Sequence, residues 1–221
     1  MGAVKIGRMT VGIYGTNCYF LYREGAPDAV VIDAPDHGKQ LCIRLEQSGL
    51  HVRAILLTHS HFDHIWGAAE LRSTASAFAE ERGEEPVKIY AAESERELLE
   101  DAGKNVSAQM GRPVTLRPNV WLRDGEELEL AGIRIRVLLT PGHTAGSCCF
   151  YVEEAGILIA GDTLFYESVG RTDFPTGSAG TLVRSVREKL FVLPDETDVY
   201  PGHGEETTIG HEKAYNPFVQ G

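Results

Sequence analysis

The sequence predicts an α+β fold in which two mixed β-sheets pack face to face and helices cover their outer sides, an αββα sandwich. Short apolar segments typical of strands alternate with helical patterns along the chain. The two halves also follow one order: a strand ends in an aspartate, a helix follows, and the next strand leads to a histidine. These residues are Asp33 and His59 in the first half, and Asp162 and His203 in the second.

The first half begins with strand signals. Short apolar runs bounded by turn residues predict strands over residues 18–22, 29–33, 52–57 and 87–91. Between these strands, helical patterns lie at about residues 38–49 and from His64 through Leu71. After the last of them, residues 93–101 predict a surface helix.

The second half alternates in the same way. Residues 127–130 and 133–139 flank Gly132 and predict a hairpin. Two further strands are expected at 148–152 and 156–160, around a turn. Leu182, Val186 and Leu190 lie at helical spacing and predict a helix over 181–190, after which residues 199–200 end the last strand.

Length and composition restrict the class of protein. The chain has 221 residues, which suits one large or two small domains, and a formal net charge of −11. That charge argues against a protein that binds the phosphate backbone of nucleic acids. The longest apolar runs are too short to span a bilayer, and no secretory leader opens the chain, so we expect a cytoplasmic protein without a membrane partner. The oligomeric state stays open.

The four cysteines show no metal-binding or redox spacing. They are Cys18, Cys42, Cys148 and Cys149. We expect small buried apolar residues in a reducing compartment, with the last two on opposite faces of one strand.

The strongest chemical signal is a cluster of four ligand-type residues after the strand at 52–57. These residues are His59, His61, Asp63 and His64. On an extended segment the first two project to the same side, and a turn into the next helix carries the other two to a neighbouring position. Burying three imidazoles and a carboxylate together without a metal would leave polar groups unpaired at a large cost. The cluster therefore predicts a metal site, and its ligand types suit zinc, iron or manganese.

Three further ligand-type residues follow apolar strands and small-residue turns. They are His143, Asp162 and His203. We expect them to complete the coordination of the metals. The remaining histidines, His37, His51 and His211, lack this setting and are interpreted as surface residues.

These motifs resemble the metallo-β-lactamase superfamily. The segment 59–64 matches its HxHxDH signature, the three later residues match its later metal positions, and Asp33 matches its early aspartate outside the metal shell. The resemblance extends from about Asn17 to Pro217 and implies the αββα fold of that superfamily. It also implies two divalent metal ions, zinc in first place and iron or manganese as alternatives.

Within the superfamily the sequence is most similar to glyoxalase II, the hydroxyacylglutathione hydrolases, and especially to short bacterial members. The supporting stretches are residues 141–147, 161–165, 169–173, 207–210 and 216–218. The resemblance implies that His59, His61 and His143 hold metal 1, that Asp63, His64 and His203 hold metal 2, and that Asp162 bridges them. Because only eighteen residues follow His203, we expect residues 1–221 to form a single domain without the C-terminal helical domain of full-length glyoxalase II.

The resemblance implies hydrolysis of a small-molecule thioester, S-acyl (hydroxyacyl) glutathione or a related compound. A hydroxide shared by the two metals would attack the carbonyl, with Asp63 and Asp162 as the catalytic carboxylates. Asp33 would orient ligands from outside the metal shell. Arg171 would contact a substrate carboxylate or else pair with Asp173 in its own loop, and Tyr166 is a further candidate contact.

Three other functions compete with this one. A persulfide (sulfur) dioxygenase of the same fold would use one iron held by the equivalents of His59, His143 and Asp162. A β-lactamase would be expected to carry a leader, and its commonest subclass has cysteine where Asp162 stands. A binding module in which the metals only stabilise the fold is disfavoured because all four cysteines lie outside the cluster.

Overall fold

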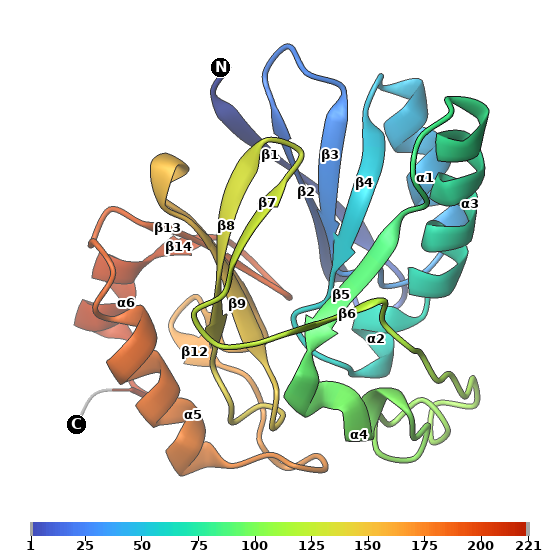
Figure 1. Cartoon of the computed structure of the whole chain (residues 1–221). Coiled ribbons are helices and arrows are strands. Elements are labelled where there is room, and N and C mark those ends of the chain that lie inside the picture. The colour runs from blue at the N-terminus through green and yellow to red at the C-terminus, as the bar shows by residue number, and fades with distance from the viewer. Residues whose placement is uncertain (1, 220–221) are drawn as a thin grey trace.

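The computed structural model describes residues 2–219 and contains two six-stranded β-sheets packed against each other (Figure 1). The first sheet contains β1 (Val4–Val11), β2 (Thr16–Arg23), β3 (Asp28–Ile32), β4 (His51–Leu56), β5 (Lys88–Ala92) and β6 (Val120–Leu122), in that order. The second runs in the order β14 (Thr207–Thr208), β13 (Asp198–Pro201), β10 (Ile157–Gly161), β9 (Cys148–Val152), β8 (Ile133–Leu139) and β7 (Glu127–Leu130). A separate pair, β11 (Leu164–Phe165) and β12 (Ser168–Val169), follows β10.

Helices cover the outer faces of both sheets. Figure 1 shows α1 (Gly38–Gln47) and α3 (Ala68–Glu81) beside the first sheet, and α5 (Ala179–Ser185) and α6 (Ile209–Tyr215) beside the second. The shorter elements are α2 (Phe62–Ile65), η1 (Glu93–Glu95), α4 (Arg96–Leu99), η2 (Glu153–Ala155) and η3 (Val186–Leu190), a π-helical continuation of α5. The predicted αββα sandwich is therefore confirmed.

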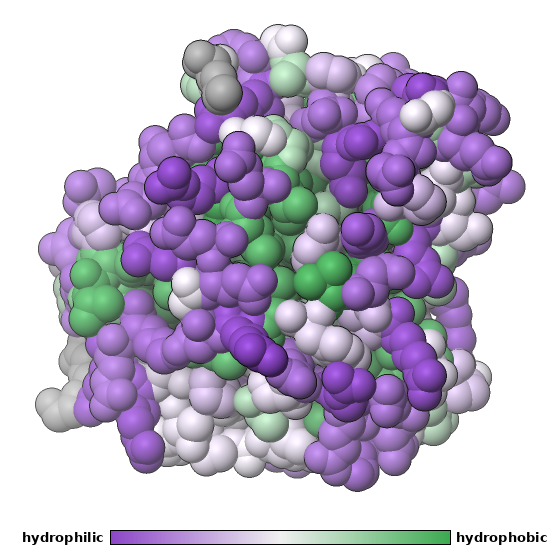
Figure 2. Space-filling view, viewed as in Figure 1, coloured by the Kyte–Doolittle hydropathy of each residue, from purple (hydrophilic) through white to green (hydrophobic). Residues whose placement is uncertain are grey.

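Three apolar layers hold the sandwich together. The middle layer lies between the sheets and joins side chains such as Leu56 of β4 and Phe150 of β9. One outer layer lies between the first sheet and its helices and includes Leu71 of α3. The other lies between the second sheet and its helices and includes Val186 and Leu190 of η3. Each strand thus buries both faces where a helix covers the sheet, which explains the continuous apolar runs in the sequence. In Figure 2, hydrophobic residues show mainly where the two sheets meet, with hydrophilic residues around them.

The predicted half-by-half repeat is present as two βαβ units. In the first, β3 and β4 are parallel neighbours connected through α1. In the second, β10 and β13 are parallel neighbours connected through α5 and η3. Parallel neighbours end at the same edge of a sheet, so the residues that follow them in the chain are brought together.

All four cysteines are buried and free, as expected. Cys148 packs between the sheets and Cys149 packs on the α5 side, which confirms that the two occupy opposite faces of β9. Among residues 2–219, no helix is long and apolar enough to cross a membrane.

The structure corrects several element predictions. The strands β1 and β6 and the helix α6 lie where none was predicted; β1 is a half-exposed edge strand without a continuous apolar run. The helix expected from His64 through Leu71 is two helices, because Gly67 lies against Ala34 and Gly38 at the start of α1, where a side chain would crowd the backbone.

The surface helix predicted at 93–101 is present as η1 and α4, which end at Leu99. Most of its side chains are exposed, and its inner face buries Glu95, Leu98 and Leu99. Glu95 is buried because the loop after His143, distant in the sequence, lies directly on η1.

Candidate metal centre

The predicted ligands all follow strands at one edge of the sandwich. His59 and His61 come after β4, and His64 lies in the short helix α2 that begins immediately afterwards. His143 follows β8, Asp162 follows β10, and His203 follows β13. These residues come from four separate places in the chain, 59–64, 143, 162 and 203, so only the folded sandwich brings their side chains together.

The first group contains three buried histidines. His61 Nδ1 lies 2.8 Å from His143 Nε2, which lies 3.2 Å from His59 Nε2. These residues are between 1% and 3% exposed. Three imidazole nitrogens that converge in this way form a group able to hold one metal ion.

The second group contains Asp63, His64 and His203. Asp63 Oδ2 lies 3.2 Å from His203 Nε2, and His64 Nε2 lies 3.4 Å from the same atom. The ligand atoms of this group also lie within 4.8 Å of one another. A second ion could therefore be held beside the first, with a mixed nitrogen and oxygen ligand set.

Asp162 lies between the two groups. Its Oδ2 is 3.6 Å from His143 Nε2 and 3.7 Å from His203 Nε2, and its Oδ1 is 3.4 Å from His64 Nε2. It also forms a third possible ligand group together with His59 and His64. One carboxylate thus faces members of both groups.

Hydrogen bonds on the far side of the rings orient the histidines. His143 Nδ1 donates to the carbonyl oxygen of Arg171 at 2.7 Å, and His64 Nδ1 donates to Asp33 Oδ2 at 2.7 Å. Because these nitrogens carry the protons, the Nε2 atoms present lone pairs to the centre. This is the arrangement that metal-binding histidines require.

Asp33 lies outside the three ligand groups and supports the centre through hydrogen bonds. Its Oδ1 accepts from Thr58 N at 2.8 Å, and its Oδ2 accepts from Thr58 Oγ1 at 2.7 Å. The same threonine hydroxyl lies 3.1 Å from His59 Nδ1 and can accept a hydrogen bond from it. Asp33 therefore orients His64 directly and His59 through Thr58. Its backbone is left-handed, with φ 59°, which aspartate tolerates better than most residues.

The charges of the cluster suit a cation. Burial lowers the pKa of His59 and, with help from His143, lowers that of His61 to about 3, so both rings are neutral at pH 7. Burial alone would raise the pKa of Asp162, but His64 and His143 outweigh it and keep the pKa below its usual range. The buried Asp162 Oδ1 has no hydrogen-bond partner. Burial opposes protonation of His64 and His203, but the carboxylates of Asp162, Asp33 and Asp63 outweigh it and raise the pKa of both rings, so this side of the cluster attracts positive charge. The neutral rings of His59 and His61 and the unsatisfied carboxylate fit a metal ion, and we conclude that this is a metal-binding cluster.

Arg171 and Tyr166 lie at the rim. The Arg171 guanidinium makes two 2.7 Å hydrogen bonds to Asp173 and stacks 3.8 Å from the ring centre of Phe174. Tyr166 is half-exposed and stacks on His211. It lines an open cavity of about 340 Å³ together with Phe165 and His203. Of the two contacts predicted for Arg171, the structure therefore shows the pairing with Asp173 in its own loop.

The other histidines stay outside the centre. His37 is exposed, whereas His51 and His211 are partly buried and pair with Glu46 and Glu167. The interpretation as surface residues therefore holds fully for His37 and only in part for the other two.

Sequence reasoning missed three residues that hold the centre. Thr58 connects Asp33 to His59, Thr16 donates to Asp63 Oδ2 at 3.1 Å, and Asn17 Nδ2 donates to the carbonyl oxygens of Pro201 and Gly204, on either side of His203. The position of Thr58 immediately before His59 was a usable signal. Nothing in the sequence indicates the other two contacts.

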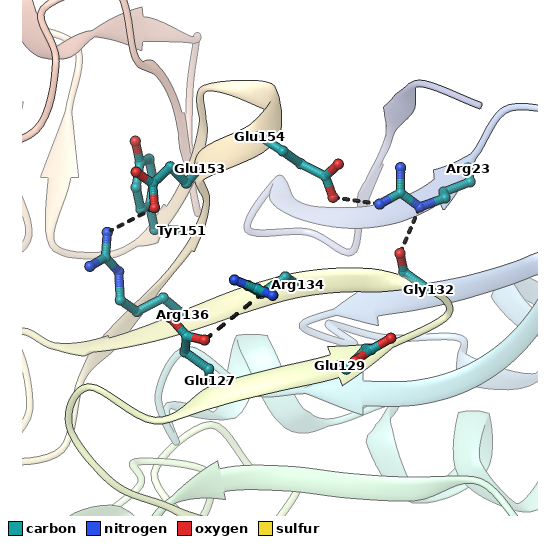
Figure 3. Close-up of a pocket in the computed structure, with 9 residues that line it drawn as sticks. All are labelled: Arg23, Glu127, Glu129, Gly132, Arg134, Arg136, Tyr151, Glu153 and Glu154. Carbon is teal, nitrogen blue, oxygen red and sulfur yellow. Dashed lines mark hydrogen bonds and ion pairs between the residues drawn. The ribbon is translucent and has the colours of Figure 1, made fainter. Parts of the chain in front are cut away.

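A charged groove of about 440 Å³ at the opposite ends of β8 and β10 is not part of this centre. Figure 3 shows its arginines directed at acidic neighbours: Arg23 pairs with Glu154, Arg136 with Glu153, and Arg134 with Glu127. Because these charges compensate one another, the groove resembles an ordinary polar surface.

The fold and this metal-binding cluster define a class of protein. The sequence model of the metallo-β-lactamase superfamily matches residues 11–203, and the chain belongs to that superfamily. It is 38% identical to the probable metallo-hydrolase YqgX of Bacillus subtilis (strain 168), with 99% of each chain covered. It is 33% identical to the hydroxyacylglutathione hydrolase GloC of Haemophilus influenzae (strain ATCC 51907 / DSM 11121 / KW20 / Rd), with 98% of each chain covered.

Solved structures agree in fold. The BLEG-1 B3 metallo-β-lactamase superposes with a TM-score of 0.85 at 35% identity, covering 98% of this chain and 100% of its own. A di-iron-bound form of TTHA1623 gives 0.79 at 33% identity, with 96% and 99% covered. ETHE1 from Myxococcus xanthus gives 0.77 at 28% identity, with 96% and 83% covered. The chain is thus a member of a metallo-hydrolase superfamily, and the resemblance seen in the sequence is confirmed.

Proposed function

We propose that this protein is a metal-dependent thioesterase that hydrolyses S-acyl glutathione, in particular hydroxyacyl glutathione, or a related thioester. The observation that carries the proposal is the position of Asp162, whose carboxylate faces His143 of one ligand group and His64 and His203 of the other. Such a shared carboxylate suits two ions held side by side. The similarity to GloC, a hydroxyacylglutathione hydrolase, supports the substrate class.

The residues divide into ligands and supports. His59, His61 and His143 would hold one ion, Asp63, His64 and His203 the other, and Asp162 would bridge them. Zinc fits this ligand set best, with iron and manganese as alternatives. When bound, a pair of dications lowers the pKa of water enough to provide a nucleophile near neutral pH.

The chain's own groups have defined tasks in this reaction. Asp63 and Asp162 face the centre with acceptor oxygens and can hold the proton that the attacking water gives up. Thr16 keeps Asp63 Oδ2 in place by a 3.1 Å hydrogen bond. The open cavity beside His203 and Phe165 provides room for the thiol half of the substrate. Attack breaks the carbon–sulfur bond, and the thiolate takes up a proton on leaving.

The test is hydrolysis of S-lactoylglutathione by metal-replete protein, with Asp162→Ala protein and chelated protein as controls. We expect rapid turnover that both controls abolish. Absence of turnover by protein that holds its full complement of metal would rule out this substrate class. Nitrocefin in the same assay tests the β-lactamase alternative, which the similarity to BLEG-1 keeps open.

A second candidate is a persulfide dioxygenase with one iron. Its favouring observation is a set of two histidines and one carboxylate, since His143 Nε2 lies 3.2 Å from His59 Nε2 and 3.6 Å from Asp162 Oδ2. Non-haem iron oxygenases use such a set with open positions. Oxygen consumption with glutathione persulfide, together with the iron content per chain, separates this function from the thioesterase.

A further inference from the structure

One buried carboxylate beside the centre has no place in the proposed reaction. Glu95 lies in η1, just after β5, and is 1% exposed. Burial raises the pKa of its carboxyl group above the ordinary value. An acidic side chain is buried at such a cost only where it has partners to hold.

The first oxygen of Glu95 holds the loop that carries His143. Its Oε1 accepts from Thr144 Oγ1 at 2.7 Å and from Gly146 N at 2.8 Å. A side chain at Gly146 would lie 2.6 Å from the backbone nitrogen of Glu95, so this close approach requires glycine. The loop and η1 are therefore packed backbone to backbone next to His143.

The Glu95 carboxyl group also lies near Ser60, in the segment that carries the other two histidines of the same group. Glu95 Oε2 and Ser60 Oγ are both buried and have no hydrogen-bond partner of normal geometry. The Ser60 hydroxyl is nonetheless close enough to lower the pKa of Glu95. A small adjustment would join them, and Ser60 lies between His59 and His61 in the chain.

We propose that Glu95 is a positioning residue that holds the His143 loop against the His59–His61 segment, and so sets the geometry of the three-histidine group. Glu95 touches neither the reacting atoms nor the ligand atoms. It acts through Thr144 and Ser60, each the immediate neighbour of a ligand. The proposal rests on the ligand roles given above for those histidines and is independent of the substrate.

The test measures metal affinity rather than turnover. Zinc affinity is determined by competition with a chromophoric chelator, and the absorption spectrum of the cobalt-substituted protein reports the ligand geometry. Unfolding of the metal-free proteins is followed in parallel. Glu95→Ala is expected to weaken zinc binding by about 10-fold, the lower end of the loss seen when a direct hydrogen-bond partner of a ligand is removed, because Glu95 acts through the neighbours of the ligands. Glu95→Gln keeps an Oε1 acceptor for Thr144 and Gly146 and is expected to stay within about threefold of wild type.

Glu97→Ala is the matched control, because Glu97 lies in α4 next to η1 but is exposed and pairs with the exposed Lys104. It should leave zinc affinity unchanged. Equal zinc affinity in folded Glu95→Ala and wild-type protein, with only the metal-free stability lowered, would overturn the proposal. So would a Glu95→Gln protein as weak as Glu95→Ala.

If Glu95→Ala does not fold, Thr144→Val and Thr144→Ser make the same comparison. Only the serine variant keeps the hydroxyl that donates to Glu95, so only the valine variant should weaken zinc binding. Equal affinities in the two would contradict the proposal. A wild-type protein that binds no zinc, iron or manganese would instead refute the metal centre itself, which keeps the two failures distinct.

Discussion

The two βαβ units of this protein place an aspartate at the same point and use it differently. Asp33 follows β3 and Asp162 follows β10, each before the helix that leads to a parallel neighbouring strand. The Asp33 carboxylate accepts from Thr58 N, Thr58 Oγ1 and His64 Nδ1. Asp162 has a buried oxygen without a hydrogen bond and faces three imidazole nitrogens.

The difference shows that local topology decides where a carboxylate is placed, whereas its partners decide what it can do. A carboxylate whose lone pairs are filled by protein donors orients its neighbours. One that lacks such donors in a buried setting needs a cation. The histidines differ in a similar way: His59 is 1% exposed, whereas the His203 side chain is 29% exposed and lines the mouth of the centre.

The largest effect is expected from Asp162→Asn. The amide has the same shape but cannot supply a negative charge to two ions. Mutation of a group that only hydrogen-bonds to a metal ligand already lowers metal affinity or activity by about 10–100-fold. For Asp162 itself we therefore expect a loss of more than about 100-fold in kcat/KM and fewer metal ions per chain. Thioester hydrolysis and elemental analysis measure both, with the variant's melting curve as control. Retention of full activity and metal content would show that the two aspartates do not differ as described.

Asp33→Asn should have the next largest effect. Asparagine tolerates the left-handed backbone at φ 59°, so the fold should survive. The hydrogen bond from His64 would lose its charged acceptor, and we expect metal affinity to fall by about 10–100-fold. Chelator competition measures the affinity, and circular dichroism checks the fold. A variant with wild-type affinity would mean that the fixed backbone, not the carboxylate, orients His64.

A smaller, pH-dependent effect is expected for Glu95→Gln without metal. Burial raises the pKa of Glu95 above its ordinary 4.5, so in the window above that value the folded state binds more protons than the unfolded state. Stability therefore falls as pH rises through the window, and glutamine removes this loss. The Tm advantage of the variant over wild type should grow from pH 4.5 upward and then level off. An advantage that is constant with pH would contradict the burial of an ionisable carboxyl group.

The smallest effect is expected at the charged groove far from the centre. Arg134 and Glu127 are exposed and 4.0 Å apart, so Arg134→Ala should change the free energy of unfolding by at most about 0.5 kcal/mol. Chemical denaturation and the thioester assay measure stability and activity. A loss of turnover in this variant would mean that the groove, with its compensated charges, takes part in function after all.

The sequence by itself determined the sandwich, the cluster of ligand-type residues and the three later residues of the same types that join it. The reason is that these features are local: apolar strands end in small-residue turns, and His59, His61, Asp63 and His64 fall within six positions. Side chains that follow parallel strands meet at one edge whatever the details of packing. The βαβ repeat could be recognised for the same reason.

Only the tertiary structure decided which partners those residues have. Thr16 and Asn17 reach the centre from the start of β2, and the loop after His143 buries Glu95, which lies within the predicted surface helix. The contact between Glu95 and Gly146 joins residues 51 positions apart. Such a contact leaves no periodicity in the sequence, because burial of a polar side chain depends on what a distant loop brings to it.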